Sequence, residues 1–180
     1  ASKPLGGWLS RKTCQREKVG DRAVDDVGTN GDAGALPTRA RAPRIVRGVA
    51  RHFVDLGSSV LAEVPLANGR RADLLALDGQ GRLAIVEVKS GPADLAADHK
   101  WPDYRDFCDR FYFAVDVDFP RARLPAGTGV VLADDYGAEI VAAAPSHPLS
   151  AARRKAVTLR FAHLAARRLM GVDDPLAQLS

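Results

Sequence analysis

Two acidic residues and a lysine stand out in the middle of the chain, because their types and spacing suit work on a phosphate group. Asp73 lies in the segment RADLLAL, and Glu87 and Lys89 lie in the segment LAIVEVK. If both segments are strands, alternate side chains share a face, so Glu87 and Lys89 point the same way. Two charges at the end of an apolar strand need a partner, because burying an unpaired charge is costly. A bound cation would provide one.

The chemistry that this triad would support is metal-dependent cleavage of a phosphodiester bond. Two carboxylates on neighbouring strands form an oxygen site for Mg²⁺ (or Mn²⁺), and Mg²⁺ prefers few protein ligands and keeps several waters. The main-chain carbonyl of Val88 is a candidate third ligand. The ion would polarise a phosphate oxygen and lower the pKa of a water, while Lys89 would orient that water and offset the growing charge. The alternative is an ordinary ion pair between Glu87 and Lys89 on a solvated strand face.

The pattern of apolar residues predicts the elements that would position the triad. Apolar residues at helical spacing predict a first helix that begins near Arg44 and ends before Gly57. The short turn between the strands of Asp73 and Glu87 should bring their carboxylates together. In chain order, the pattern predicts strands at 60–66, 71–77 and 83–89, helical segments at 93–100 and 102–108, strands at 110–115, 128–133 and 138–142, and a long helix at 150–170. This order predicts an α/β fold.

Composition is that of one ordinary domain, with 180 residues, 46% hydrophobic and 27% charged. Residues 1–41 carry no sustained helix or strand period and are predicted to be a disordered tail, followed by one domain at 42–172 and a flexible C-terminus at 173–180. The net charge of +4 suits a partner with phosphates. Cys14 and Cys108 have no zinc spacing, no apolar run reaches the ~20 residues that span a bilayer, and no secretory signal is visible. A cytoplasmic protein without a membrane partner is expected.

A turn signal before the strand of Asp73 decides which way a third acid points. Asn68 and Gly69 predict a two-residue turn. In that register Val64 pairs with Asp73, and Glu63 points to the opposite face of the sheet. A bulge near Pro65 would reverse this, and on that condition Glu63 is a candidate to support the site.

The triad and its surroundings resemble a known group of enzymes, the PD-(D/E)XK nuclease superfamily. From about Arg44 to Met170, the chain resembles more closely the MmcB-related bacterial DNA repair proteins, on the segments PLANGRRADLLAL, IVEVKSGPADLAADHKWPDY, CDRFYFAV, ADDYGAEI and AARRKAVTLRFA. The resemblance implies a restriction-endonuclease-like core, with a mixed central β-sheet flanked by helices. It also implies a role in DNA repair or damage tolerance, and metal-binding and catalytic roles for Asp73, Glu87 and Lys89. Many superfamily members carry a further Glu on the first helix, where this chain offers only Asp55.

Residues that follow the triad are candidates to support it. Asp98 or Lys100 would reach the metal's water or a DNA phosphate, and Trp101 or Tyr104 would stack on a base. The alternative is a solvated acid and an aromatic residue that closes the core.

Basic side chains are candidates for contacts with the DNA backbone. Arg153, Arg160 and Arg167 recur every seven residues in the last predicted helix and form one stripe along it. This stripe lies beside an apolar one that consists of Val157, Phe161 and Leu164. It is interpreted either as a rail for phosphates or as the solvated edge of a packed helix. Arg70 and Arg71, beside the predicted turn, are candidates to contact the same DNA strand.

The expected function is DNA repair by Mg²⁺-dependent hydrolysis of DNA phosphodiester bonds. The alternative is a catalytically weak or inactive module that binds DNA or a repair partner on the same fold, which the missing acid on the first helix favours. DNA is the expected partner. Other repair proteins, and a second copy of the chain as in nucleases that engage two strands, are further candidates.

Overall fold

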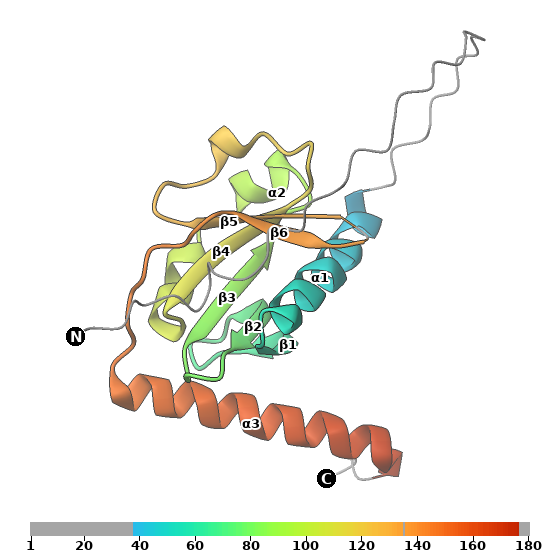
Figure 1. The fold of residues 1–180 in the computed structure, drawn as a ribbon, viewed down its shortest axis with the longest axis vertical. Coiled ribbons are helices and arrows are strands. Elements are labelled where there is room, and N and C mark those ends of the chain that lie inside the picture. Colours follow the sequence, from blue (N-terminus) through green and yellow to red (C-terminus); the bar gives the residue numbers. More distant parts are fainter. Residues whose placement is uncertain (1–37, 135, 177–180) are drawn as a thin grey trace, which may run out of the picture.

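A six-stranded mixed sheet forms the centre of the molecule in the computed structural model, which describes residues 38–134 and 136–176 (Figure 1). The strands lie side by side in their chain order. The elements are α1 (Thr38–Asp55), β1 (Ser59–Pro65), β2 (Arg71–Leu77), β3 (Leu83–Val88), α2 (Pro92–Ala97), the 3₁₀ helix η1 (Trp101–Phe107), β4 (Arg110–Val115), the 3₁₀ turn η2 (Arg121–Arg123), β5 (Gly129–Ala133), β6 (Ala138–Ala142) and α3 (Ala151–Asp173).

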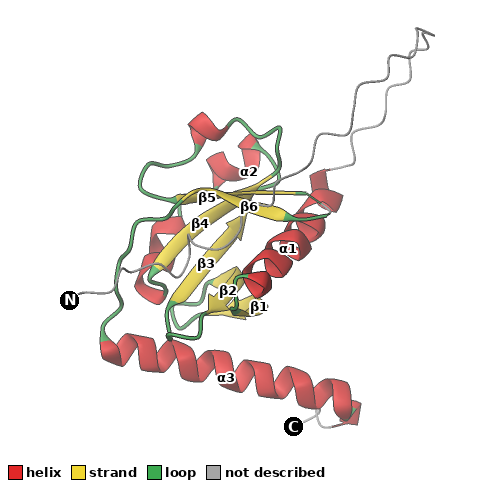
Figure 2. Ribbon diagram, viewed as in Figure 1, coloured by secondary structure: helices red, strands yellow, loops and turns green. Residues whose placement is uncertain are grey.

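Strand direction divides the sheet into three parts. β1, β2 and β3 are antiparallel neighbours, β3, β4 and β5 run parallel, and β6 is antiparallel to β5. Helices flank the sheet, and α2 and η1 lie in the connection that crosses from β3 to β4 (Figure 2). The predicted α/β fold with a mixed central sheet is confirmed, and it is consistent with a restriction-endonuclease-like core.

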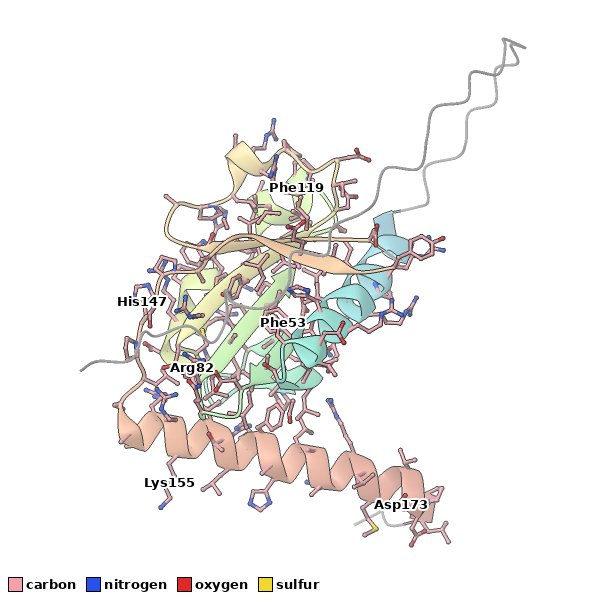
Figure 3. All side chains as sticks on the ribbon, viewed as in Figure 1. Phe53, Arg82, Phe119, His147, Lys155 and Asp173 are labelled. Atoms are coloured by element: carbon pink, nitrogen blue, oxygen red, sulfur yellow. The ribbon has the colours of Figure 1, made fainter. Side chains whose placement is uncertain are left out.

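Helix α1 covers one face of the sheet. Its residues Ile45, Val49 and Phe53 are buried, and Figure 3 labels Phe53 between α1 and the sheet. The ring of Phe53 meets that of Tyr112 edge-on, at 5.9 Å between centroids. α1 begins at Thr38 rather than near Arg44. The sequence pattern does not predict the first turns, because their small apolar residues and Pro43 give no amphipathic period. Of the tail predicted at 1–41, residues 1–37 lie outside the described residues, whereas 38–41 belong to α1, so that part of the prediction is wrong.

Helices η1 and α3 cover the other face. Tyr104 and Phe107 of η1 pack with Val157 and Phe161 of α3 in a second buried cluster, and Leu164 packs against it. The predicted apolar stripe of the last helix is therefore confirmed. The hydroxyl of Ser150 accepts the N–H of Arg153 at 3.3 Å, so this serine caps the N-terminus of α3.

A buried carboxylate ties the start of α3 to the sheet. Asp109 precedes β4, and its side chain is only 5% exposed. It accepts the backbone N–H groups of Leu83 at 2.8 Å and Leu149 at 3.0 Å, and both terminal nitrogens of Arg154 at 2.6 Å. Burial raises the pKa of Asp109, but the hydrogen bonds from Arg154 and the backbone outweigh it and hold this pKa below its usual value. Its charge therefore stabilises the fold at neutral pH, and this contribution is lost as pH falls through the folded-state pKa.

We expect Asp109→Ala to lower the free energy of unfolding by about 3 kcal/mol, because buried donors left unpaired cost ~1–3 kcal/mol each. Urea unfolding at neutral pH measures the change. Asp118→Ala is the matched control at an exposed position and should stay within ~0.5 kcal/mol of the wild type. A loss for Asp109→Ala no larger than that of the control would contradict the anchoring role.

Candidate functional site

Asp73 and Glu87 lie opposite each other where the pairing of β2 and β3 ends. The last pair in the ladder is Leu74 with Val86, and the next residues in register are the two acids. Beyond this pair, carboxylate oxygens accept main-chain N–H groups in place of the ladder's carbonyl oxygens. Glu87 Oε1 accepts the N–H of Asp73 at 3.1 Å, and Asp73 Oδ2 accepts the N–H of Val88 at 2.8 Å. The short turn between the strands thus brings the two carboxylates together, as expected.

The electrostatics of this pair favour a positive charge. Burial, followed by the neighbouring charge of Asp73, raises the pKa of Glu87 to about 8, although the N–H of Asp73 and the charge of Lys89 oppose the shift. Burial also raises the pKa of Asp73, although the N–H of Val88 and the charge of Lys89 oppose it. Burial and the mutual repulsion of the two carboxylates therefore favour a proton on the pair. A cation bound between the carboxylates would replace that proton.

Lys89 is buried beside the pair and is held by Asp98. Its Nζ lies 2.6 Å from Asp98 Oδ2 and 4.0 Å from Glu87 Oε2. Burial lowers the pKa of Lys89, but the hydrogen bond and charge of Asp98 outweigh it and raise this pKa overall. Asp98 also accepts the N–H of Lys100 at 2.9 Å, while the Lys100 residue itself is exposed. Of the two candidates that follow the triad, Asp98 contacts it directly.

The hairpin before Asp73 has a three-residue loop, so the predicted register, in which Val64 pairs with Asp73, is wrong. The N–H of Leu66 donates to the carbonyl of Arg70 at 2.7 Å. A two-residue primed turn needs positive φ at both central positions, and only Gly69 adopts it, at 80°. The register is therefore shifted by one residue from the predicted one. The pairs Ala62 with Leu74 and Val64 with Ala72 place Glu63 opposite Asp73.

The backbone of Glu63 interrupts the regular alternation of β1. Its φ is 53°, a left-handed value that costs a non-glycine residue about 1–2 kcal/mol. Leu61 and Val64 both pack in the cluster under η1 and α3, although they are three residues apart, whereas Ala62 packs on the α1 side. The carboxylate of Glu63 is half exposed, and its charge contributes to the raised pKa of Asp73. Glu63 therefore lies at the rim of the site.

The two arginines of the hairpin are paired with acids around this rim. Arg71 Nε lies 2.5 Å from Glu63 Oε2, and both side chains are exposed. Arg70 binds Asp103 of η1, with Nε at 3.2 Å and a terminal nitrogen at 2.9 Å from the same carboxylate oxygen. Asn68 adds a bond to the carbonyl of Asp103 at 3.2 Å. The hairpin is thus attached to η1 beside the candidate site.

The predicted basic stripe of α3 is used in part for packing. The guanidinium of Arg153 lies 5.0 Å from the centre of the Phe107 ring. A terminal nitrogen of Arg160 donates to the carbonyl of Pro65 at 3.2 Å. Arg167 is exposed. The three arginines therefore do not form one uniform solvent-facing row.

The aromatic residues of η1 belong to the core. Trp101 packs on the rings of Phe111 and Phe113, at 5.6 and 6.0 Å between centroids. Tyr104 is buried, and its hydroxyl donates to the carbonyl of Arg71 at 3.1 Å, which supports the start of β2 under the site. Of the two readings of these residues, core packing is the one that the structure supports. The hydroxyl contact of Tyr104 had no signal in the sequence, because it joins residues that are far apart in the chain.

Comparison with known proteins identifies the family. Residues 33–176 match a family described as DNA repair protein MmcB-like. The chain belongs to this MmcB-like family. It is also similar to SPO1766, a protein of unknown function from Silicibacter pomeroyi, with 44% identity and a TM-score of 0.71, over 78% of this chain and 94% of that one. No curated protein matches it.

The donor set of this MmcB-like chain fits a hard cation. Among the described residues, no group of three or more His, Cys, Asp or Glu side chains is placed to hold a metal ion. The site offers Asp73, Glu87 and the main chain at Val88. Mg²⁺ commonly takes one or two carboxylates and keeps waters, so these donors suit it, whereas a zinc site needs three or four protein ligands. In the described segments, no helix is both long and apolar enough to cross a bilayer.

We expect Glu87→Gln to remove a pH-dependent loss of stability. The folded-state pKa of Glu87 is raised to about 8 from 4.5, so the folded chain binds the extra proton between these values and its stability falls as pH rises through them. Gln keeps the shape of the protonated acid. At about pH 9 without metal, its Tm should exceed that of the wild type by at least ~4 °C, which corresponds to about 1 kcal/mol.

Thermal melts from about pH 5 to pH 9 in a chelating buffer measure this difference. The gain should shrink toward the acid end of the series. Glu139→Gln, at an exposed position of β6, is the control and should follow the wild type throughout. A Glu87→Gln curve that stays parallel to the wild-type curve would overturn the assignment of the raised pKa.

Proposed function

We propose that this MmcB-like chain hydrolyses phosphodiester bonds of DNA with a divalent cation, Mg²⁺ or Mn²⁺, bound at Asp73 and Glu87. The observation that carries the proposal is the geometry of the pair. Two poorly exposed carboxylates lie opposite each other, and the buried ammonium group of Lys89 is 4.0 Å from one of them. The family's role in DNA repair supports DNA as the substrate.

The residues of the triad divide two tasks in this reaction. Asp73, Glu87 and the main-chain carbonyl of Val88 would hold the cation. A divalent cation polarises a phosphate oxygen and lowers the pKa of water. Lys89 orients the attacking water and offsets the charge that grows on the phosphate in the transition state. Water adds to phosphorus, the bond to the leaving oxygen breaks, and that oxygen takes a proton, which leaves a phosphate monoester and a hydroxyl group.

Residues around the triad position it and contact the DNA backbone. Asp98 is a positioning residue, because its 2.6 Å bond fixes the ammonium group of Lys89. Lys100 and Arg167 are exposed and therefore accessible to phosphates. Other basic residues proposed to contact DNA already make bonds or ring contacts within the domain, and these are Arg70, Arg71, Arg153 and Arg160.

We expect Glu87→Ala and Lys89→Ala each to reduce DNA cleavage by at least ~100-fold, as loss of one transition-state contact typically does. Purified variants are tested with Mg²⁺ and with Mn²⁺ on single-stranded, branched and lesion-bearing DNA. Glu139→Ala is the matched control and should cut at the wild-type rate. Cleavage that persists in both triad variants, or its absence from the wild type on every substrate, would rule out this active site.

A second candidate function is a module that binds DNA or a repair partner without cutting. It is favoured by the absence of a three-acid cluster among the described residues and by the fact that each carboxylate of the pair already accepts a backbone N–H. Other repair proteins and a second copy of the chain stay as predicted partners in both functions.

Metal-linked stability separates the two functions. If the site binds metal, Mg²⁺ or Mn²⁺ at about 100 times its Kd should add ~2.7 kcal/mol of stability and raise Tm. Asp73→Asn should abolish this shift, because it removes a charged ligand while keeping the size of the side chain. Calorimetric melts with and without the ion measure it. DNA binding that survives Asp73→Asn, together with a wild-type Tm that does not respond to metal, favours the binding module.

A further inference from the structure

A pocket of about 570 Å³ lies at the start of α3, away from the Asp73–Glu87 pair. Its walls come from the end of η1, the linker that follows β6 and the first turn of α3. The charged and polar side chains that line it include Arg105, Asp106, His147, Ser150 and Arg153. In Figure 3, His147 lies on the linker that leads into α3, and Lys155 points away from the sheet on the outer side of the helix.

Both arginines of the pocket are held in place by aromatic rings of η1. The guanidinium of Arg105 lies 4.9 Å from the centre of the Trp101 ring and donates to the carbonyl of Gly127 at 2.8 Å. The guanidinium of Arg153 lies 5.0 Å from the centre of the Phe107 ring. A ring contact uses the flat face of a guanidinium and leaves its N–H edge for an anion. The two cations are therefore pre-oriented before any ligand arrives.

The charge of the pocket favours an anion. Two arginines line it against one acid, Asp106, and His147 adds a further donor. The first turn of α3 contributes partial positive charge from its N-terminal N–H groups. A phosphate group matches this combination of forked donors and positive charge.

We propose that this pocket binds a backbone phosphate of duplex DNA, away from the bond that is cut. The proposal rests on DNA as the substrate of the Asp73–Glu87 site. η1 links the two places, because it begins just after Asp98, the partner of Lys89, and ends at Phe107, under Arg153. Its seven residues span about 14 Å at ~2.0 Å per residue. At ~3.4 Å of rise per nucleotide, this length corresponds to about four nucleotides of one strand.

The test measures how DNA affinity depends on salt, without any divalent cation. Full-length wild type and the variants Arg105→Ala, Arg153→Ala and the double variant bind a labelled duplex of about 20 base pairs across a salt series. Loss of one phosphate contact should lower the slope of log K against log salt by ~0.9. Because both arginines bind the same phosphate, the double variant should lose about as much slope as either single variant. Lys155→Ala, on the outer side of α3, is the control and should keep the wild-type slope.

Three results would overturn the proposal. These are an unchanged slope in Arg153→Ala, additive losses of ~1.8 in the double variant, and an equal loss in Lys155→Ala. Arg105 is partly buried, so a thermal melt without DNA checks that the Arg105→Ala variant folds. If that variant does not fold, the salt slope of Arg153→Ala, at an exposed position, is the test. If the salt slope falls in Arg153→Ala but the wild type cuts no DNA, the phosphate pocket is supported and the proposed nuclease activity is ruled out. If Glu87→Ala loses DNA cleavage but the salt slope of Arg153→Ala is unchanged, the nuclease activity is supported and the phosphate pocket is ruled out.

Discussion

Asp73 and Glu87 face each other at the point where main-chain pairing between β2 and β3 stops, and the charge of this pair constrains the groups around it. Two carboxylates so close and so poorly hydrated cannot both be ionised without compensating positive charge. Two backbone N–H groups and Lys89 supply part of it, but Asp98 lies closer to Lys89 than Glu87 does. The remainder comes from a proton, as the raised pKa of Glu87 indicates, or from a cation. Proton uptake and metal affinity are therefore two responses to the same electrostatic requirement.

The basic composition of α3 has more than one physical origin. β1 is an edge strand, so one row of its backbone groups has no partner strand. Arginines of α3 occupy that row: Arg160 donates to the carbonyl of Pro65, and Arg168 donates to the carbonyls of Ala62 and Glu63 at 2.5 and 2.9 Å. A buried or edge carbonyl that gains a donor is stabilised, and a guanidinium can serve two at once. A helix rich in arginine is consequently not by itself a surface for DNA.

Local patterns were sufficient to predict the fold and the core of the site. The apolar runs of β2 and β3 and strict strand alternation place Glu87 and Lys89 on one face, and the short turn after β2 brings Asp73 alongside. The register of β1 was not predictable, because it depends on whether Asn68 adopts a positive φ. Asn68 does not adopt one, and the hairpin has a three-residue loop instead of the predicted two-residue turn. The contacts of Arg168 join residues that are 105 and 106 positions apart, and no local pattern reports such a contact.

The shifted register changes what Glu63 contributes to the site. Glycine would adopt its left-handed backbone without strain, yet the position carries a glutamate, and strain of this kind is concentrated at functional sites. The donors of Arg168 on the carbonyls of Ala62 and Glu63 hold that backbone in place. The side chain then brings a third acid to the rim, opposite Asp73, where Arg71 neutralises it. The charge at this rim therefore depends on whether the exposed ion pair between Glu63 and Arg71 stays intact.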